Sequence, residues 1–203
     1  MVTERPPENT LAEHIGLELK RVELELAVAN ARIKTLENER GIDVLTGLPN
    51  RLFLKSRLGK LIEELNYNRE GEVRKSVPIG IIVFQIDLKG LKSFNKNGQV
   101  EGDKALVAFA DLLRHTARNN DMVFRIGGDE FIAIFPIESK ATGTDLKEVF
   151  EGVVERIQDA LSNTAYMGYS IIRKGENLTT DELLITADQE MVKNKKKEKT
   201  EGK

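Results

Sequence analysis

The chain has 203 residues, of which 40% are hydrophobic and 32% are charged, and its formal net charge is -2 at pH 7. This composition is typical of a globular protein, and the length suits one domain with an appendage. The small net charge gives no reason to expect a nucleic-acid partner. The absence of cysteine excludes disulfides and thiolate metal sites, and it fits a reducing compartment.

The start of the chain gives no sign of export or of membrane insertion. Residues 1–9 are polar and contain Pro6 and Pro7, unlike the apolar core of a secretory signal. No apolar run approaches the roughly 20 residues that span a bilayer. We therefore expect a cytoplasmic protein with no membrane contact, in which residues 1–9 are a disordered start.

Residues 10–41 are predicted to form a helix that carries a narrow apolar seam. The apolar positions follow one another in steps of 4, 3, 4, 3, 4 and 3 residues, which is the spacing of a coiled coil. The seam indicates a homodimer formed through residues 12–40. Leu17 and Leu24 lie on another face and leave open an amphipathic helix that packs on its own domain. The seam positions are Ile15, Leu19, Val22, Leu26, Ala29, Ile33 and Leu36.

The rest of the chain alternates strand and helix patterns. From residue 79 the order is β-α-β-β-α-β with a final helix, which predicts an α+β sandwich of the ferredoxin-like type. Val77–Ile86 is a continuous apolar run, so this strand is expected to be buried on both faces. The expected helices are 51–67, a possible short helix after Asp87, 102–117, 145–161 and 180–195; the expected strands are 77–86, 122–126, 130–135 and 166–172; and 68–77 is an expected loop.

Three carboxylates stand at strand ends. Asp87 follows the buried strand, and Asp129 and Glu130 lie at the hairpin turn beside two glycines. In this fold the first strand neighbours the hairpin, so the carboxylates can meet over a shared Mg²⁺ that binds a triphosphate. Taken singly, a strand-end Asp is more often a cap, and Gly-Gly-Asp-Glu is an ordinary solvated turn.

Two segments resemble the sequence motifs of the GGDEF domains, the diguanylate cyclases that make cyclic di-GMP from GTP. One is Gly127-Gly128-Asp129-Glu130-Phe131 with Arg125 before it, and the other is Asp43-Val44-Leu45-Thr46-Gly47-Leu48-Pro49-Asn50-Arg51. The resemblance covers about residues 43–199. It implies a nucleotidyl cyclase (palm-type) domain at 42–199 with a tail at 200–203, Mg²⁺ or Mn²⁺ as cofactor, and GTP held by each half of a dimer.

The resemblance also implies roles by position. Asp87 and Asp129 would bind the metal with the Leu88 carbonyl, and Glu130 would assist at the metal or at the attacking 3′-hydroxyl, which makes Asp129 and Glu130 the expected catalytic residues. A carboxylate can accept from both N1–H and the exocyclic amine of guanine, which adenine does not offer. The guanine-reading pair would be Asn95 and Asp103; the phosphate-binding residues Lys92, Arg125, Lys195 and Lys199; and the inhibitory site for cyclic di-GMP Arg118 and Asp121.

Several of these positions have simpler interpretations. The lysines near the end of the chain form a run that is also typical of a solvated basic tail. Arg118 and Asp121 can be a surface salt bridge. Inhibition can also require a second arginine from the partner domain, which the sequence does not identify.

The chain departs from the family pattern around the nucleotide pocket. Lys89 stands where a second Asp is common, Tyr166 where Ser is common, and Asn194 where Ala is usual. A cation at residue 89 would weaken Mg²⁺ binding if it pointed inward.

These departures motivate a second hypothesis, a catalytically degenerate domain that acts as a cyclic di-GMP receptor. A third hypothesis is a cyclase that makes a mixed GMP–AMP dinucleotide, and a fourth is a dimerising interaction module. An upstream sensor partner would supply the input signal.

Overall fold

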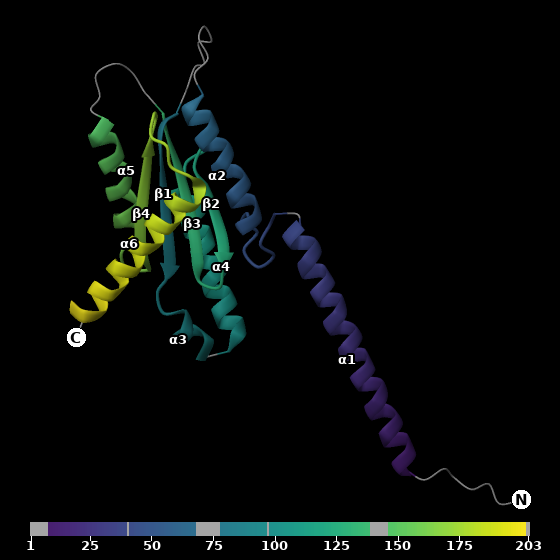
Figure 1. Ribbon diagram of the computed structural model, residues 1–203. Coiled ribbons are helices and arrows are strands. Elements are labelled where there is room, and N and C mark those ends of the chain that lie inside the picture. Colours follow the sequence, from purple (N-terminus) through teal and green to yellow (C-terminus); the bar gives the residue numbers. More distant parts are fainter. Residues whose placement is uncertain (1–7, 40, 68–77, 97, 139–145, 202–203) are drawn as a thin grey trace, which may run out of the picture. The chain divides into compact units, whose positions relative to one another are not determined.

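The computed structural model describes residues 8–39, 41–67, 78–96, 98–138 and 146–201 (Figure 1). The chain divides into an N-terminal unit, which holds helix α1 (Glu8–Glu39), and a folded domain that begins at Gly41. Helix α1 begins two residues earlier than we predicted. Most of the predicted disordered start, the predicted loop at 68–77 and residues 202–203 of the predicted tail lie outside the described residues.

The domain is built around a four-stranded antiparallel sheet with the strand order β2-β3-β1-β4. The predicted α+β class and β-α-β-β-α-β order are confirmed. The elements of the domain are α2 (Arg51–Asn66), β1 (Pro78–Leu88), α3 (Leu91–Lys96), α4 (Gln99–Thr116), β2 (Met122–Gly127), β3 (Glu130–Glu138), α5 (Leu146–Leu161), β4 (Ala165–Arg173) and α6 (Thr180–Glu201).

Strand β1 lies at the centre of the sheet and is buried on both faces, as its apolar run predicts. Its side chains alternate between two cores. Ile82, Phe84 and Ile86 pack with residues of α4 and α5 on one face, whereas Ile81 and Val83 pack with residues of α2 and α6 on the other. By this alternation, Asp87 faces the side of the sheet that α2 and α6 cover.

Helix α1 exposes to solvent those seam side chains that the structure describes. Ile15, Leu19, Val22 and Leu26 are each more than half exposed. The side chains of the seam residues Ile33 and Leu36 lie outside the described part of the chain. None of the described helices is long and apolar enough to cross a lipid bilayer.

Helix α6 is longer than the sequence pattern predicts. We expected the helix to end near Lys195, but it continues to Glu201. Its second half is attached to the sheet: Asn194 Nδ2 donates to the carbonyl of Met167 (2.9 Å), and Lys195 pairs with Asp87. These polar contacts hold a segment that has no apolar periodicity of its own.

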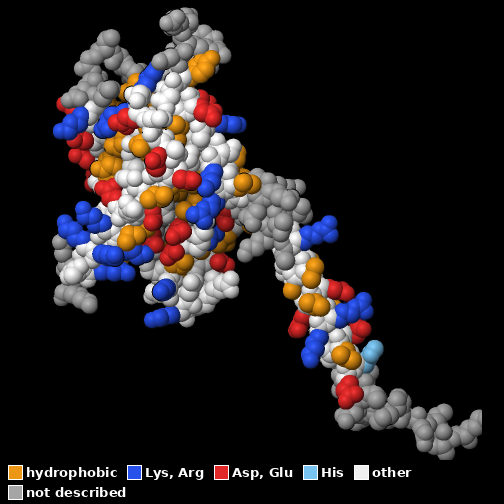
Figure 2. All heavy atoms as spheres, in the orientation of Figure 1, with side chains coloured by type: hydrophobic (Ala, Val, Ile, Leu, Met, Phe, Trp, Pro, Cys, Tyr) orange, Lys and Arg blue, Asp and Glu red, His pale blue; other side chains and the backbone are white. Residues whose placement is uncertain are grey.

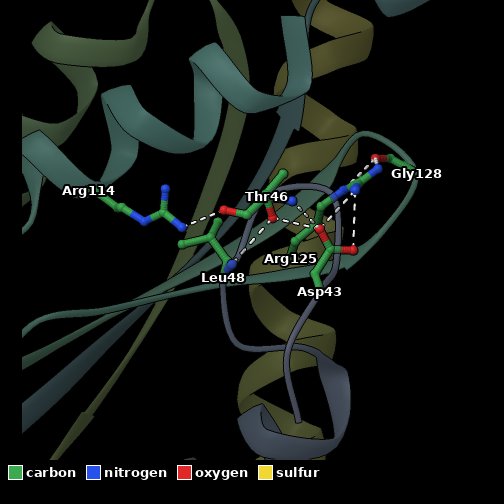
Figure 3. A network of polar contacts seen from close by, with 6 residues as sticks. All are labelled: Asp43, Thr46, Leu48, Arg114, Arg125 and Gly128. Atoms are coloured by element: carbon green, nitrogen blue, oxygen red, sulfur yellow. Dashed lines mark hydrogen bonds and ion pairs between the residues drawn. The ribbon is translucent and has the colours of Figure 1, made fainter. Parts of the chain in front are cut away.

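The segment 41–51 forms a tight turn that docks on the sheet, and we call it the 41–51 turn (Figure 3). Asp43 accepts hydrogen bonds from the Thr46 backbone N–H (2.9 Å) and hydroxyl (2.6 Å). The Arg114 guanidinium of α4 donates to the Thr46 carbonyl. The side chain of Asn50 caps α2 by accepting hydrogen bonds from the N–H groups of Leu52 and Phe53.

Arg125 of β2 links this turn to the hairpin. Its Nη1 lies 3.0 and 3.2 Å from the two carboxylate oxygens of Asp43, and its Nε and Nη2 donate to the Gly128 carbonyl at 3.1 and 2.8 Å. The Arg125 backbone N–H also donates to the Pro49 carbonyl (3.0 Å). One guanidinium therefore joins the start of the domain to the β2–β3 turn (Figure 3).

Asp43→Asn should destabilise the domain by about 1–2 kcal/mol at neutral pH, because it removes a charge-assisted bond between two mostly buried groups. Burial acts to raise the pKa of Asp43, but hydrogen bonds from Thr46 and Arg125 and the Arg125 charge outweigh it and hold that pKa below the ordinary value of 3.8. This stability is present above about pH 3.8 and is lost as the pH falls through the folded-state pKa.

Urea denaturation between about pH 6 and about pH 3 measures the difference between Asp43→Asn and wild type, which should shrink toward the acid end. Asp111→Asn is the matched control, because its pair with Arg114 is exposed and should contribute little. Equal small effects for the two variants would contradict a structural role for Asp43.

Candidate active site

The sheet register brings the predicted carboxylates to one end of β1. Asp87 is the direct partner of Glu130 on β3 and of Tyr166 on β4. The Leu88 N–H donates to the carbonyl of Asp129 (3.0 Å), which ties the end of β1 to the hairpin turn. The backbone register therefore places Asp87, Asp129 and Glu130 next to one another at one end of the sheet, as the fold argument predicts for these three residues, and Leu88 lies beside them.

The hairpin turn is held in shape by the protein itself. Gly128 has φ 44°, a left-handed conformation that a residue with a side chain rarely adopts. Its carbonyl is fixed by Arg125. Asp129 and Glu130 follow directly, so their backbone position depends on this turn.

The negative charges around Asp87, Asp129 and Glu130 favour a bound cation. Burial raises the pKa of Glu130, and the neighbouring carboxylates Asp129, Asp188 and Asp87 raise it further, with Arg51 opposing them. A cation would relieve that repulsion, and carboxylate oxygens are the ligands that Mg²⁺ prefers. The donor set therefore fits a divalent ion. As the side chains stand, however, no three acidic or histidine groups of the described residues are close enough to hold one.

A lysine of α6 forms an ion pair with the carboxylate of Asp87, near the end of β1. Lys195 Nζ contacts both carboxylate oxygens of Asp87, at 2.8 and 2.7 Å. The Asp87 side chain is only 10% exposed, so this ammonium compensates a carboxylate that is costly to bury alone. Figure 2 shows Lys and Arg side chains gathered along the C-terminal part of α6, next to acidic side chains.

The Lys89 ammonium also forms hydrogen bonds within the protein. It donates to the Ser162 carbonyl (2.7 Å) and to Glu198 of α6 (2.5 Å). It lies 4.8 Å from the centre of the Tyr166 ring, which Lys195 and Lys199 also approach, at 5.2 and 6.0 Å. Three ammonium groups thus surround one aromatic ring beside Asp87.

Asn95 and Asp103, the predicted guanine-reading pair, come from adjacent helices. Asn95 is exposed on α3, and Asp103 is half-buried in the first turns of α4. Gly102 lies between them, where an added Cβ would stand 1.8 Å from Asn95 Oδ1. A glycine at this position therefore permits the observed orientation of the Asn95 amide.

The predicted phosphate-binding residues come from different elements of the domain. Lys195 and Lys199 lie by Tyr166, whereas Lys92 is exposed on α3. Arg125 gives Nε and both terminal nitrogens to Gly128 and Asp43. Its role toward phosphate remains a prediction.

The predicted inhibitory site is a turn in the connection between α4 and β2. The carboxylate of Asp121 accepts from the Arg118 backbone N–H (2.7 Å) and lies 3.7 Å from Arg156 of α5. Burial raises the pKa of Asp121, opposed by the Arg118 N–H and the charge of Arg156. Arg156 Nε is buried and has no hydrogen-bond partner in the described part of the structure.

Sequence reasoning named Tyr166 only as a departure from the family pattern, and it missed Glu198 and Arg156. The place of Tyr166 beside Asp87 could have been found by pairing the strands, because the two residues are level in neighbouring strands. Glu198 and Arg156 lie on helices far along the chain, and only tertiary packing shows what they contact.

Comparison with known proteins agrees with this fold. The family model for "Diguanylate cyclase, GGDEF domain" matches residues 41–201. The chain is 30% identical over 161 residues to the diguanylate cyclase TpbB of Pseudomonas aeruginosa, covering 76% of this chain and 34% of that protein. It thus spans about a third of the length of this curated relative.

Solved structures show the same relation. A sensory box/GGDEF family protein of Caulobacter crescentus matches with a TM-score of 0.62 at 26% identity, over 77% of this chain and 99% of that one. The diguanylate cyclase SiaD of P. aeruginosa, in complex with its activator SiaC, matches with a TM-score of 0.58 at 25% identity, over 93% and 73%. The chain therefore belongs to the diguanylate cyclase GGDEF-domain family.

Proposed function

We propose that this protein is a diguanylate cyclase that condenses two GTP molecules into cyclic di-GMP with release of two pyrophosphates. The observation that carries the proposal is the pairing of Asp87 with Glu130 in the sheet, next to Asp129, in a domain of this family. A carboxylate cluster whose own repulsion favours a bound cation suits nucleotidyl transfer.

Asp87, Asp129 and the Leu88 carbonyl would hold Mg²⁺ or Mn²⁺. When bound, such an ion neutralises charge on a triphosphate and fixes its orientation. Glu130, with its raised pKa, would accept the proton of the attacking 3′-hydroxyl. The oxygen then bonds to the α-phosphorus of the other nucleotide, and the bond to pyrophosphate breaks.

Asn95 and Asp103 would read the guanine base, and Lys92, Lys195 and Lys199 would contact the phosphates. We assign Arg125 chiefly to positioning, because its guanidinium fixes the Gly128 carbonyl next to Asp129. Asp103 argues against a mixed GMP–AMP product, since a carboxylate pairs with the two donors of guanine.

Cyclic di-GMP would bind at Arg118 and Asp121 and inhibit the enzyme. Arg156 supports this proposal, because its buried Nε has no hydrogen-bond partner within the described residues and the Nη2 of the same guanidinium lies 3.7 Å from the Asp121 carboxylate. The same observation favours the second candidate function, a receptor for cyclic di-GMP that makes no product.

The α1 seam would bring two domains together, since one domain holds one GTP and the product needs two. Four exposed apolar side chains at heptad spacing support a partner helix. An upstream partner would supply the input; SiaD, a similar protein, is found in complex with an activator.

Asp129→Asn should reduce product formation at least about 100-fold, because it removes a metal ligand at the reacting phosphate. Pyrophosphate release from GTP and Mg²⁺, with the product identified by mass, measures this. Asp159→Asn, on the exposed face of α5, is the control and should keep the wild-type rate. A wild-type protein that binds cyclic di-GMP tightly but releases no pyrophosphate would instead support the receptor.

Gly102→Ala should weaken binding of a non-hydrolysable GTP analogue by about tenfold, because the added Cβ displaces the Asn95 amide. The melting temperature should change little, since the clash is with the end of an exposed side chain. Isothermal titration compares this variant with Gly152→Ala, where an added Cβ meets nothing within 4 Å. Equal affinities in both variants would argue against Asn95 as a base reader.

The double variant Leu19→Glu with Leu26→Glu should convert a dimer to a monomer in sedimentation and lower the rate at least about tenfold at low protein concentration. Leu17→Glu with Leu24→Glu places the same charges off the seam and should leave both unchanged. If the two pairs behave alike, the seam is not the dimer interface.

A further inference from the structure

The buried carboxylate at the proposed metal site already has a positive partner. Asp87 is 10% exposed at its side chain, and Lys195 Nζ contacts both of its oxygens at 2.7 and 2.8 Å. The lysine comes from α6, on the side of the sheet that Asp87 faces. A divalent ion that binds Asp87 must use the same two oxygens.

An ammonium and a divalent ion do not share one carboxylate without cost. Both are positive, and on the same oxygens they would stand about 4 Å apart beside a carboxylate that is mostly buried, where their repulsion is strong. The Lys195 ammonium on Asp87 therefore opposes binding of the ion, and the ion binds more tightly once the ammonium leaves.

The next carboxylate along α6 is already paired. Glu198 lies one turn beyond Lys195, and its carboxylate is bound by Lys89 at 2.5 Å. Lys89 and Lys199 lie around the same Tyr166 ring as Lys195, so the ring side of the displaced ammonium is positive. The carboxylates of Asp129, Glu130 and Asp188 lie on the other side, where the metal itself would bind. An incoming triphosphate is the anion that would receive Lys195 at this place.

Helix α6 can stay in position while this happens. Asn194 donates to the Met167 carbonyl at 2.9 Å, and the Lys89–Glu198 pair holds the next turn. Only the Lys195 side chain has to rotate.

We propose that Lys195 exchanges its ammonium between Asp87 and the nucleotide phosphates, so that the divalent ion binds tightly only together with the nucleotide. This inference rests on the proposed function of the site. The proposal predicts thermodynamic coupling between the two ligands. Bound nucleotide draws Lys195 away from Asp87 and so raises the affinity for the metal, and bound metal releases Lys195 and so raises the affinity for the nucleotide.

The test uses Mn²⁺ alone, on the nucleotide-free protein, with unbound Mn²⁺ counted by electron paramagnetic resonance. Lys195→Gln should bind Mn²⁺ about tenfold more tightly than wild type, because the competing charge is gone. Lys195→Arg keeps the charge and should bind like wild type. Lys196→Gln removes an equal charge from an exposed neighbour and should shift the affinity less than about twofold.

Addition of α,β-methylene GTP should tighten Mn²⁺ binding by a smaller factor in Lys195→Gln than in wild type. The variant Asp87→Asn distinguishes a failure of the Lys195 exchange from a failure of the proposed metal site. If it abolishes Mn²⁺ binding while Lys195→Gln equals wild type, the exchange is overturned and the metal site stands. If Asp87→Asn binds Mn²⁺ as wild type does, the metal site itself is wrong and the exchange falls with it.

Discussion

The antiparallel pairing of β1 with β3 is the constraint on which the site depends. Its register sets Asp87 opposite Glu130, and the Leu88 N–H closes the pair onto the Asp129 carbonyl. Because β1 is buried on both faces, a slip of one residue would move every core side chain to the wrong face. The apolar packing of the sheet therefore fixes the position of its polar end.

The charged side chains at the end of the sheet that holds Asp87 pair with residues that are far apart in sequence. Lys195 and Glu198 come from the last helix, Lys89 from the end of β1, and Asp43 reaches the hairpin through Arg125. Within the domain, the same guanidinium joins the 41–51 turn to the β2–β3 turn at the Gly128 carbonyl.

Much of this could be predicted from sequence. Continuous apolar strands and helical spacing predicted the element order, and the positions of Asp87 and Glu130 at strand ends predicted that they lie side by side in the sheet. The contacts of Lys195 could not be predicted, because a lysine run has no periodicity and looks like a solvated tail. The role of Arg125 was hidden for a similar reason: its partner Asp43 lies 82 residues away, and the sequence alone shows only two separate motifs. Packing of helices against the sheet decides such pairs.

The most direct test of this account is a crystal structure with Mn²⁺ and α,β-methylene GTP, with the metal located by its anomalous scattering. The account predicts Mn²⁺ bound by Asp87 and Asp129, guanine at Asn95 and Asp103, and Lys195 turned from Asp87 to a phosphate oxygen. A metal bound away from Asp87, or Lys195 still paired with Asp87 in the loaded protein, would contradict it.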